Sequence, residues 1–302
     1  MRIALVGLGD IAQKAYLPLL TSDERVTPLL CTRNSTVLHK LARQYRIVEC
    51  FTELGGLLAS RPDAVMIHAA TAVHLELAAQ CLRAGIPTFV DKPLCDTFAG
   101  VESLANLALA QNCPLFVGFN RRYLPAMSEA RGQPLTELNW QKHRHALAGA
   151  PRAFLFDDFI HVLDSLCYYG GTPDGDLHAV LRRCTRQPEL LAGVSVAWQS
   201  GQVAVSGSMN RSAGITEERI DAYGDNLSLH IENCTRGTMA RDKSVLTLAP
   251  DDWQPVLTQR GFVAMLAHWY QQIEAGRADG ALIESYLYSH RLAEQLVALA
   301  GE

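Results

Sequence analysis

The first twelve residues, MRIALVGLGDIA, constrain the fold of this chain more than any other segment. A short apolar run, 3–6, is followed at once by Gly7, Gly9 and Ala12 in the pattern Gly-x-Gly-x-x-Ala. Gly7 permits a sharp turn after a strand, Gly9 lets a pyrophosphate approach the backbone, and Ala12 lets the next helix pack closely. The N–H groups that start such a helix attract phosphate oxygens. The segment therefore predicts a dinucleotide-binding turn with these cofactor contacts: Gly7, Gly9, Asp10 and Ile11.

Short apolar runs alternate with amphipathic segments through the first 118 residues. Strands are expected at 26–31, 47–51, 64–68, 86–90 and 114–118. Helices are expected at 10–21, 35–44, 53–59, 73–84 and 97–111, with Pro18 kinking or ending the first of them. Strands and helices that alternate with short links form a parallel sheet with right-handed crossovers. The fold class is therefore α/β, with a Rossmann domain over residues 1–118.

The remaining residues, 119–302, predict an α+β domain with a large, mainly antiparallel open sheet. Its strands alternate apolar and polar residues, and they are expected at 135–145, 177–184, 190–199, 202–210, 217–223, 226–233 and 245–248. Helices at 259–275 and 281–299 would close the domain. A sheet with one packed face often covers the other by self-association, so we expect a homodimer or higher homo-oligomer through this sheet.

Composition limits the classes of partner. The 302 residues are 48% hydrophobic and 19% charged, as in globular enzymes. A net charge of −4 gives no electrostatic reason to expect nucleic acid, and no apolar run is long enough to span a bilayer. The eight cysteines are scattered without a Cys-x-x-Cys pair, which favours neither a zinc site nor disulfides. Because the chain enters a strand directly, without a signal-peptide pattern, we expect a cytoplasmic protein with no membrane partner.

The second expected strand ends without the acidic residue that usually binds the ribose of NAD. Thr32 and Arg33 stand there instead, and a guanidinium suits a 2′-phosphate. This favours NADP over NAD, although an Arg33 stacked on adenine or facing solvent would fit the same sequence. Two further cofactor contacts are expected after the strand at 64–68, at the edge where doubly wound sheets bind ligands: Ala70 and Thr71.

Asp157, His161 and Asp164 stand at i, i+4 and i+7 of a segment that predicts a helix, 156–166. This spacing places them on one face of an otherwise apolar α-helix. Burying three ionisable groups costs free energy unless they have partners or a function. The stripe therefore predicts either a reactive site or an Asp–His–Asp cluster that only fastens the helix. Further ligands at suitable spacing are missing, so no metal is expected.

Several stretches resemble one oxidoreductase family. They are the opening Gly-Leu-Gly-Asp-Ile-Ala, Thr71-Ala72-Val73-His74, the run 84–94 with Asp91-Lys92-Pro93, Gly118-Phe119-Asn120-Arg121-Arg122-Tyr123, and Asp-x-x-x-His-x-x-Asp at 157–164. Together they make the chain similar to the Gfo/Idh/MocA family of glucose–fructose oxidoreductases and inositol dehydrogenases, and within it to the MviM branch. The resemblance covers essentially the whole chain. The family usually has Glu-Lys-Pro, so Asp91 keeps the acidic group but shortens it.

The resemblance implies roles for the residues at these motifs. Lys92 would lie beside the nicotinamide and the reacting oxygen, where an ammonium stabilises a developing alkoxide. His161 would accept the hydroxyl proton of the substrate, Asp157 would orient the substrate or the histidine, and Asp164 would set the imidazole tautomer. His74 would either face the cofactor or only cap and pack. The implied site comprises Lys92, Asp157 and His161 as catalytic residues, Asp91, Lys92, His74 and Asn120 at the cofactor, and Arg121 and Asp164 in support.

These features predict an NAD(P)-dependent dehydrogenase that transfers a hydride between a secondary alcohol of a sugar, cyclitol or polyol and NADP or NAD. The alternatives are a redox-neutral enzyme that cleaves a glycoside through transient oxidation, and a nucleotide-sensing regulator without catalysis. Asp158 departs from the small residue of the family and would narrow the substrate pocket. The basic cluster Lys142-His143-Arg144 either binds an anionic substrate or is a solvated strand end.

Overall fold

A computed structural model describes residues 1–301, which divide into two compact units. The first unit contains Met1–Gly118 and Phe262–Leu287. The second contains Phe119–Gly261 and the residues from Tyr288 onward. Each unit has its own sheet, and the two are described separately below.

The segment 262–287 belongs to the first unit, whereas the sequence places it in the C-terminal domain. Aromatic packing is the physical reason. The Phe262 ring meets Tyr16 edge-on with ring centres 5.6 Å apart, and Trp269 meets Phe116 at 5.6 Å. Periodicity alone identifies this helix but says nothing about which sheet it covers.

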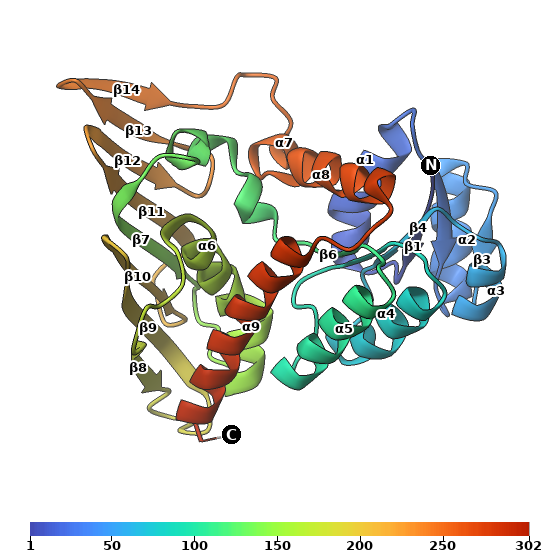
Figure 1. Ribbon diagram of the computed structural model, residues 1–302, viewed down its shortest axis with the longest axis horizontal. Coiled ribbons are helices and arrows are strands. Elements are labelled where there is room, and N and C mark those ends of the chain that lie inside the picture. The colour runs from blue at the N-terminus through green and yellow to red at the C-terminus, as the bar shows by residue number, and fades with distance from the viewer. Residues whose placement is uncertain (302) are drawn as a thin grey trace. The chain divides into compact units, whose positions relative to one another are not determined.

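A six-stranded parallel sheet forms the centre of the first unit, as expected of a Rossmann fold (Figure 1). Its order is β3-β2-β1-β4-β5-β6. The strands are β1 (Arg2–Val6), β2 (Thr27–Cys31), β3 (Cys50–Phe51), β4 (Ala64–Ile67), β5 (Thr88–Val90) and β6 (Leu115–Val117). Every residue of β4 and β5 is buried, because helices cover both faces of such a sheet.

The helix after the glycine turn begins with a wide π-helical segment, η1 (Ala12–Tyr16), and continues as α1 (Leu17–Ser22). Pro18 does not end it, because it stands in the first turn of α1, where a missing N–H is tolerated. The other helices of this unit are α2 (Ser35–Tyr45), α3 (Leu54–Ala59), η2 (Thr71–Val73), α4 (His74–Arg83), α5 (Phe98–Ala110), α8 (Phe262–Ala275) and the first part of α9 (Gly280–Leu299).

An eight-stranded sheet dominates the second unit, in the order β14-β13-β12-β11-β7-β10-β9-β8. The strands are β7 (Leu135–His143), β8 (His178–Arg183), β9 (Leu191–Ser200), β10 (Val203–Asn210), β11 (Glu217–Gly224), β12 (Leu227–Glu232), β13 (Arg236–Arg241) and β14 (Ser244–Leu248). All neighbours are antiparallel except β7 and β10. The sequence does not predict β13, because its residues are all at least partly exposed and show no apolar alternation.

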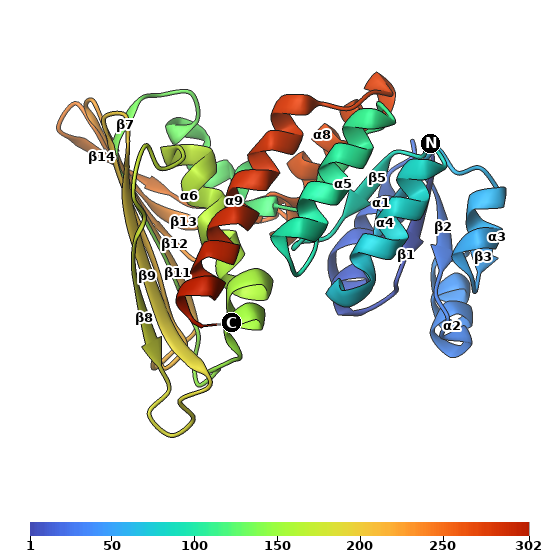
Figure 2. The same ribbon diagram turned by 60° about the horizontal axis from the view of Figure 1, so that its bottom comes forward.

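The helices of the second unit pack on one face of this sheet (Figures 1 and 2). They are η3 (Asn120–Tyr123), η4 (Pro125–Ala130), η5 (Ala153–Phe159), α6 (Ile160–Gly170), α7 (Val256–Gln259) and the last part of α9. The contact between α6 and β10 is close: a Cβ atom added to Gly207 would lie 2.6 Å from Leu166. Glycine at position 207 therefore allows this close approach of α6 to β10.

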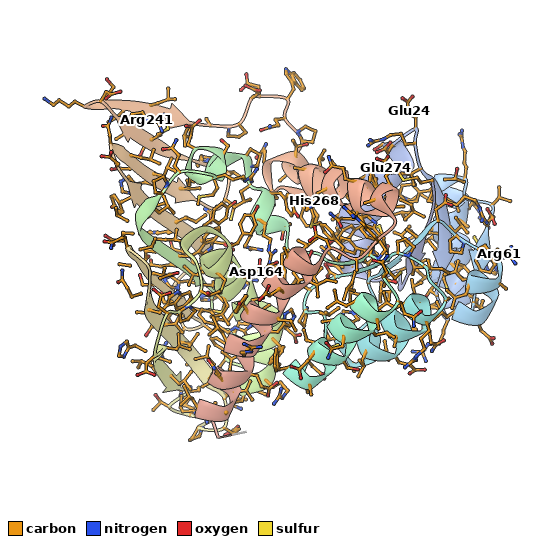
Figure 3. The ribbon with its side chains drawn as sticks, viewed as in Figure 1. Glu24, Arg61, Asp164, Arg241, His268 and Glu274 are labelled. Atoms are coloured by element: carbon orange, nitrogen blue, oxygen red, sulfur yellow. The ribbon has the colours of Figure 1, made fainter. Side chains whose placement is uncertain are left out.

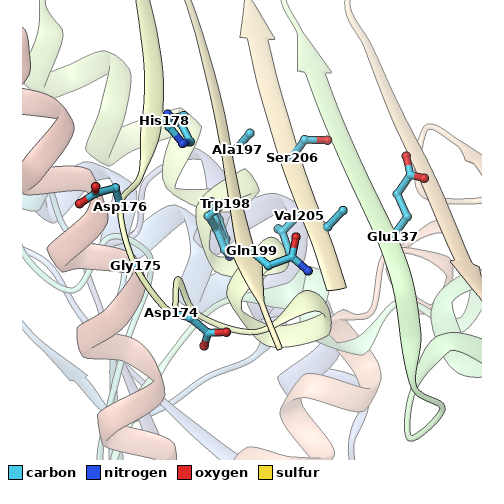
Figure 4. A pocket seen from close by; sticks show the side chains of 11 residues that line it. Glu137, Asp174, Gly175, Asp176, His178, Ala197, Trp198, Gln199, Val205 and Ser206 are labelled. Atoms are coloured by element: carbon cyan, nitrogen blue, oxygen red, sulfur yellow. The ribbon is translucent and has the colours of Figure 1, made fainter. Parts of the chain in front are cut away.

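The opposite face of the sheet presents small and polar side chains. Figure 4 shows a pocket on this face, with Glu137 on β7, Ala197 and Gln199 on β9, and Ser206 on β10. These are the outward positions of the predicted alternation. Among residues 1–301, no helix is both long and apolar enough to cross a membrane.

Candidate active site

The glycine turn has the geometry that the sequence predicts. Gly7 adopts a positive φ of 86°, and a Cβ atom there would lie only 2.5 Å from the backbone nitrogen of Ala69. At Gly9 the nearest atom to such a Cβ is the carbonyl oxygen of His68, 4.0 Å away, so the backbone is accessible on that side. Gln13 donates its N–H to the Gly9 oxygen at 3.1 Å, and the helix therefore begins directly at the turn. Such a turn fits the pyrophosphate of a dinucleotide.

The end of β2 leaves Arg33 exposed. The Thr32 N–H is held by the Phe51 oxygen at 3.1 Å, and the Asn34 side chain caps α2 by accepting the Val37 N–H at 3.1 Å. These contacts fix the backbone on both sides of Arg33 and leave its guanidinium directed to solvent. The side chain is therefore available for a group bound at this edge of the sheet.

Asp91 and Lys92 follow β5 at the same edge. Tyr16, on the buried side of η1, donates its hydroxyl to Asp91 Oδ1 at 3.0 Å. Burial raises the pKa of Asp91, and the charge of Lys92 and the hydrogen bond from Tyr16 oppose this shift. Gly118 leaves room for the pair, because a Cβ atom there would lie 2.9 Å from the Tyr16 hydroxyl. Tyr16 was not identified from the sequence, where it belongs to an ordinary apolar helix face.

His74 joins two loops of the first unit. It is buried, its Nδ1 lies 2.9 Å from the Pro93 carbonyl oxygen, and its Nε2 lies 2.9 Å from that of Ala69. One ring thus ties the loop after β4, which continues into Ala70 and Thr71, to the loop that carries Lys92. The sequence left two roles open for His74, contact with the cofactor or only capping and packing, and these contacts favour packing.

His68 is a buried histidine that sequence reasoning passed over. Neither ring nitrogen has a hydrogen-bond partner within residues 1–301, and the ring stacks on Tyr16 with centres 4.1 Å apart. Burial, together with the nearby His74, lowers its pKa to about 3. The ring is therefore neutral at ordinary pH and acts as an aromatic packing group behind the glycine turn.

In the second unit, the stripe of Asp157, His161 and Asp164 differs from the prediction. Residues 153–159 form a π-helix, so positions four apart no longer share one face across this segment. Asp157 is exposed, whereas Asp158, His161 and Asp164 are buried. Asp158 points into the unit, and sequence reasoning had assigned it only a steric role.

Asp164 does not set the tautomer of His161, contrary to the role that the family resemblance implies. Its carboxylate is held by Arg122, with Nε–Oδ2 at 2.9 Å and Nη2–Oδ1 at 2.6 Å, inside the second unit (Figure 3). The group at Nδ1 of His161 is instead the Arg121 guanidinium, at 3.0 Å. A guanidinium only donates, so Nδ1 accepts and a neutral ring carries its proton on Nε2.

Arg121 is itself fixed by Glu218. The two side chains form a bidentate pair, with Nε–Oε1 at 2.6 Å and Nη2–Oε2 at 2.7 Å, and Trp140 donates to the same carboxylate at 2.8 Å. Burial raises the pKa of Glu218, but the charge and hydrogen bonds of Arg121, together with Lys142 and Trp140, outweigh it and lower this pKa to about 2. Asn120, next in the chain, donates its side-chain amide to the Arg260 oxygen at 2.9 Å. Glu218 therefore fixes the guanidinium that contacts His161.

A second ionic group surrounds Asp158. Its carboxylate accepts hydrogen bonds from Lys142 at 2.5 Å, from Arg144 at 2.9 Å and from Arg211 at 2.9 Å. Burial would raise the pKa of Asp158, but these cations hold it well below its usual range. Lys142 and Arg144 are thus not the solvated strand end that was one reading of the sequence. Arg211 and Glu218 were missed.

The fold and the glycine turn define an oxidoreductase with an NAD-binding Rossmann domain. Residues 1–119 match the family described as "Oxidoreductase family, NAD-binding Rossmann fold", and residues 124–242 match "YceM-like, C-terminal domain". The chain belongs to the Gfo/Idh/MocA family, as its motifs indicated. The members of this family are enzymes, namely dehydrogenases and related oxidoreductases.

Three relatives illustrate this similarity. A Gfo/Idh/MocA family oxidoreductase from Vibrio cholerae is 44% identical, with a TM-score of 0.93 over 99% of this chain and 97% of that one. The dehydrogenase MviM from Clostridium difficile is 26% identical, with a TM-score of 0.91 over 99% of both chains. YceM of Salmonella typhimurium is 29% identical over 98% of this chain and 97% of its own length. The resemblance to the MviM branch is thereby confirmed.

Proposed function

We propose that this protein transfers a hydride between a secondary alcohol of a sugar, cyclitol or polyol and a nicotinamide cofactor. The observation that carries the proposal is the meeting of three loops at one edge of the Rossmann sheet, after β1, β4 and β5. These loops supply the glycine turn, the Ala69–Ala70 segment held by His74, and Lys92. When bound, the nicotinamide would supply or accept the hydride.

In this proposal, Lys92 stabilises negative charge on the reacting oxygen and exchanges the proton with it. His161 contacts the same oxygen through Nε2 as a hydrogen-bond donor, because Arg121 occupies its Nδ1 side. This modifies the earlier assignment of His161 as the proton acceptor. Asp157, which is exposed, orients the substrate hydroxyl groups. Lys92 belongs to the first unit and the other two residues to the second, so their joint action on one substrate is part of the proposal.

The test is a cofactor-reduction assay with NADP⁺ or NAD⁺ and fractionated cell metabolites, followed through the absorbance of the reduced nicotinamide. We expect a signal in at least one fraction that is abolished in Lys92→Met and strongly reduced in His161→Asn. Lys40→Met, at an exposed lysine of α2, is the matched control and should keep full activity. Release of a sugar leaving group without net reduction would indicate the redox-neutral reaction instead. Tight cofactor binding with no turnover in any fraction would favour a sensor.

We also propose NADP as the preferred cofactor. Arg33 is exposed at the end of β2, and the sequence directly after this strand, residues 32–36, has no acidic residue to bind the ribose hydroxyls or to repel a 2′-phosphate. Arg33→Ala should reduce the affinity for NADPH by about tenfold and leave the affinity for NADH nearly unchanged. An unchanged ratio of the two dissociation constants would remove the basis for this preference.

Finally, we propose a cytoplasmic homodimer or higher homo-oligomer that associates through the outward face of the eight-stranded sheet. The small and polar side chains on β9 and β10 would let two such faces approach closely. Light scattering coupled to size exclusion gives the state, and Ala197→Arg together with Ser206→Arg should convert the oligomer to monomer. Cell fractionation tests the location.

A further inference from the structure

The ionic group around Asp158 gathers cations from two separate segments of the second unit. Lys142 lies on β7, Arg144 directly follows this strand, and Arg211 directly follows β10. Since β7 and β10 run parallel as neighbours, their carboxyl ends bring these side chains to one place. There they converge on the π-helix η5 that carries Asp158. We call Lys142, Arg144, Arg211 and Asp158 the Asp158 cluster.

The Asp158 cluster has more positive charge than its own carboxylate can balance. Three cations share one carboxylate, and the exposed fractions are 5% for the Lys142 side chain and 8% for those of Arg211 and Asp158. Burial of unbalanced charge is costly, and proteins normally avoid it with a counterion or a partner. The neighbouring carboxylate of Glu218 does not balance this excess, because it is paired with Arg121. The exposed Asp157 acts on Arg211 through its charge, so two carboxylates face three cations and an excess of positive charge remains.

The free donors of the cluster are suited to an oxyanion. An ammonium has three N–H donors, and within residues 1–301 the structure pairs one of them, with Asp158. Arg144 binds Asp158 through Nε and Nη2, and 33% of its side chain is exposed, so the cluster is open to solvent on that side. Gly149 lets the Arg211 guanidinium lie against the backbone, because a Cβ atom there would lie 2.9 Å from Arg211 Nη1, which donates to the Leu147 oxygen at 3.3 Å.

We propose that the Asp158 cluster is a subsite for an oxyanion, a carboxylate or a phosphate, of the substrate. The site deepens the proposed function and rests on it for the identity of the ligand as a substrate. Asp158 precedes His161 by three residues. Arg121, whose charge acts on Lys142 of the cluster, also lies 3.0 Å from the His161 ring, so the cluster adjoins the proposed reacting centre. The substrate class then narrows from neutral polyols to acidic sugar derivatives, such as sugar acids or sugar phosphates.

The protonation of Lys142 gives the subsite a pH signature. Burial, followed by the charge of Arg121, lowers the pKa of Lys142 to about 7, although Asp158 and Glu218 favour its charged form and Arg144 opposes it. A bound oxyanion would favour the ammonium as well. Binding at about pH 8 should therefore take up close to one proton, and affinity should fall as the pH rises above about 7.

The experiment is isothermal titration calorimetry of the full chain with two matched pairs of probes. Gluconate is compared with glucitol, which has the same carbon chain and no carboxylate, and inorganic phosphate is compared with chloride at equal ionic strength. The variants are Lys142→Met and Arg144→Met, with Arg144→Lys to restore the charge. Arg219→Met is the control, since Arg219 is exposed on β11 and pairs only locally with Glu217. Circular dichroism and a thermal melt establish that each variant is folded.

We expect gluconate or phosphate to bind and glucitol and chloride not to bind. Removal of one cation should weaken binding by about tenfold, Arg144→Lys should recover most of it, and Arg219→Met should have no effect. Binding of gluconate alone would assign a carboxylate, and binding of phosphate alone a phosphate. Equal binding of the oxyanion in Arg144→Met and the wild type, or no binding to the wild type, would overturn the subsite.

The outcome also separates this inference from the proposed function. Oxyanion binding that is lost in the variants, in a protein that reduces no cofactor with any fraction, would keep the subsite and reject the dehydrogenase. Turnover of neutral polyols with no preference for acidic ones, in a protein that binds no oxyanion, would keep the dehydrogenase and reject the subsite.

Discussion

Two buried carboxylates on neighbouring turns of one helical segment have opposite electrostatic surroundings. Asp164 forms a bidentate pair with one guanidinium, that of Arg122, and the two side chains are 1% and 2% exposed. Asp158 is shared among three cations, one of which is a lysine. The first group is electrically balanced and closed, whereas the second carries an excess of positive charge and opens to solvent at Arg144.

This difference separates a structural ion pair from a binding site. A balanced pair with both partners fully buried joins η3 to α6. Such pairs contribute little net stability relative to apolar packing, but removal of one partner is strongly destabilising. A cluster with excess positive charge becomes electrically balanced only when it binds an anion. The same residue type therefore serves different purposes six positions apart.

The largest effect is expected from breaking the closed pair. Asp164→Ala leaves the Arg122 guanidinium buried without its counterion, which should lower the free energy of unfolding by about 3–5 kcal/mol. Urea unfolding followed by fluorescence measures the loss. Asp157→Ala, on the exposed side of η5, is the control and should change it by less than about 0.5 kcal/mol. A loss of similar size in both variants would mean that the buried Asp164–Arg122 pair matters no more for stability than the exposed carboxylate of Asp157.

Much of this fold could be predicted from sequence, because its signals are local. The order of strands and helices in the Rossmann unit follows from periodicity, and the glycine turn follows from Gly7 and Gly9. The assignment of α8 to that unit does not, since it depends on which aromatic rings Trp269 meets. The π-helix over residues 153–159 also escaped prediction, because the wider turn is set by tertiary packing of Phe154, Leu155 and Phe156 rather than by spacing.

One signal in the sequence could have located the ionic groups. On β7, Leu138, Trp140 and Lys142 share the buried side of the strand, so Lys142 stands in phase with the core. On β11, Glu218 is likewise in phase with the buried Ile220. A charged residue in phase with apolar neighbours must have a partner when buried. The sequence cannot supply that partner, because Asp158 lies 16 residues from Lys142 and Arg121 lies 97 residues from Glu218 along the chain.

The next largest effect is expected in the pH dependence of protein stability, to which Lys142 of the Asp158 cluster contributes. The pKa of Lys142 is about 7 in the folded protein and about 10.4 in an unfolded chain, so above pH 7 the unfolded state binds more protons. Stability from this group therefore increases as the pH rises. Between about pH 7 and pH 9 the free energy of unfolding of the wild type should increase by about 2 kcal/mol relative to that of Lys142→Met. Urea unfolding at several pH values measures this.

Two controls sharpen the result. Lys243→Met, at an exposed lysine, should show the same pH dependence as the wild type. A saturating oxyanion should flatten the wild-type profile, because a bound anion keeps Lys142 protonated. Parallel profiles for the wild type and Lys142→Met would mean that Lys142 titrates as it does in water, and the cluster would then carry a full ammonium at all ordinary pH values.

The smallest effect tests whether an anion can replace the carboxylate. In Asp158→Asn the three cations lose their shared counterion, so sulfate in solution should bind among them and stabilise the fold by mass action. We expect sulfate to raise the melting temperature of Asp158→Asn by about 2–4 °C more than that of the wild type at equal ionic strength. Sulfate stabilises most proteins slightly, so the comparison variant is Asp164→Asn. There the carboxylate forms its ion pair with a single guanidinium, that of Arg122. An equal rise in both variants would show that the excess charge around Asp158 does not recognise anions.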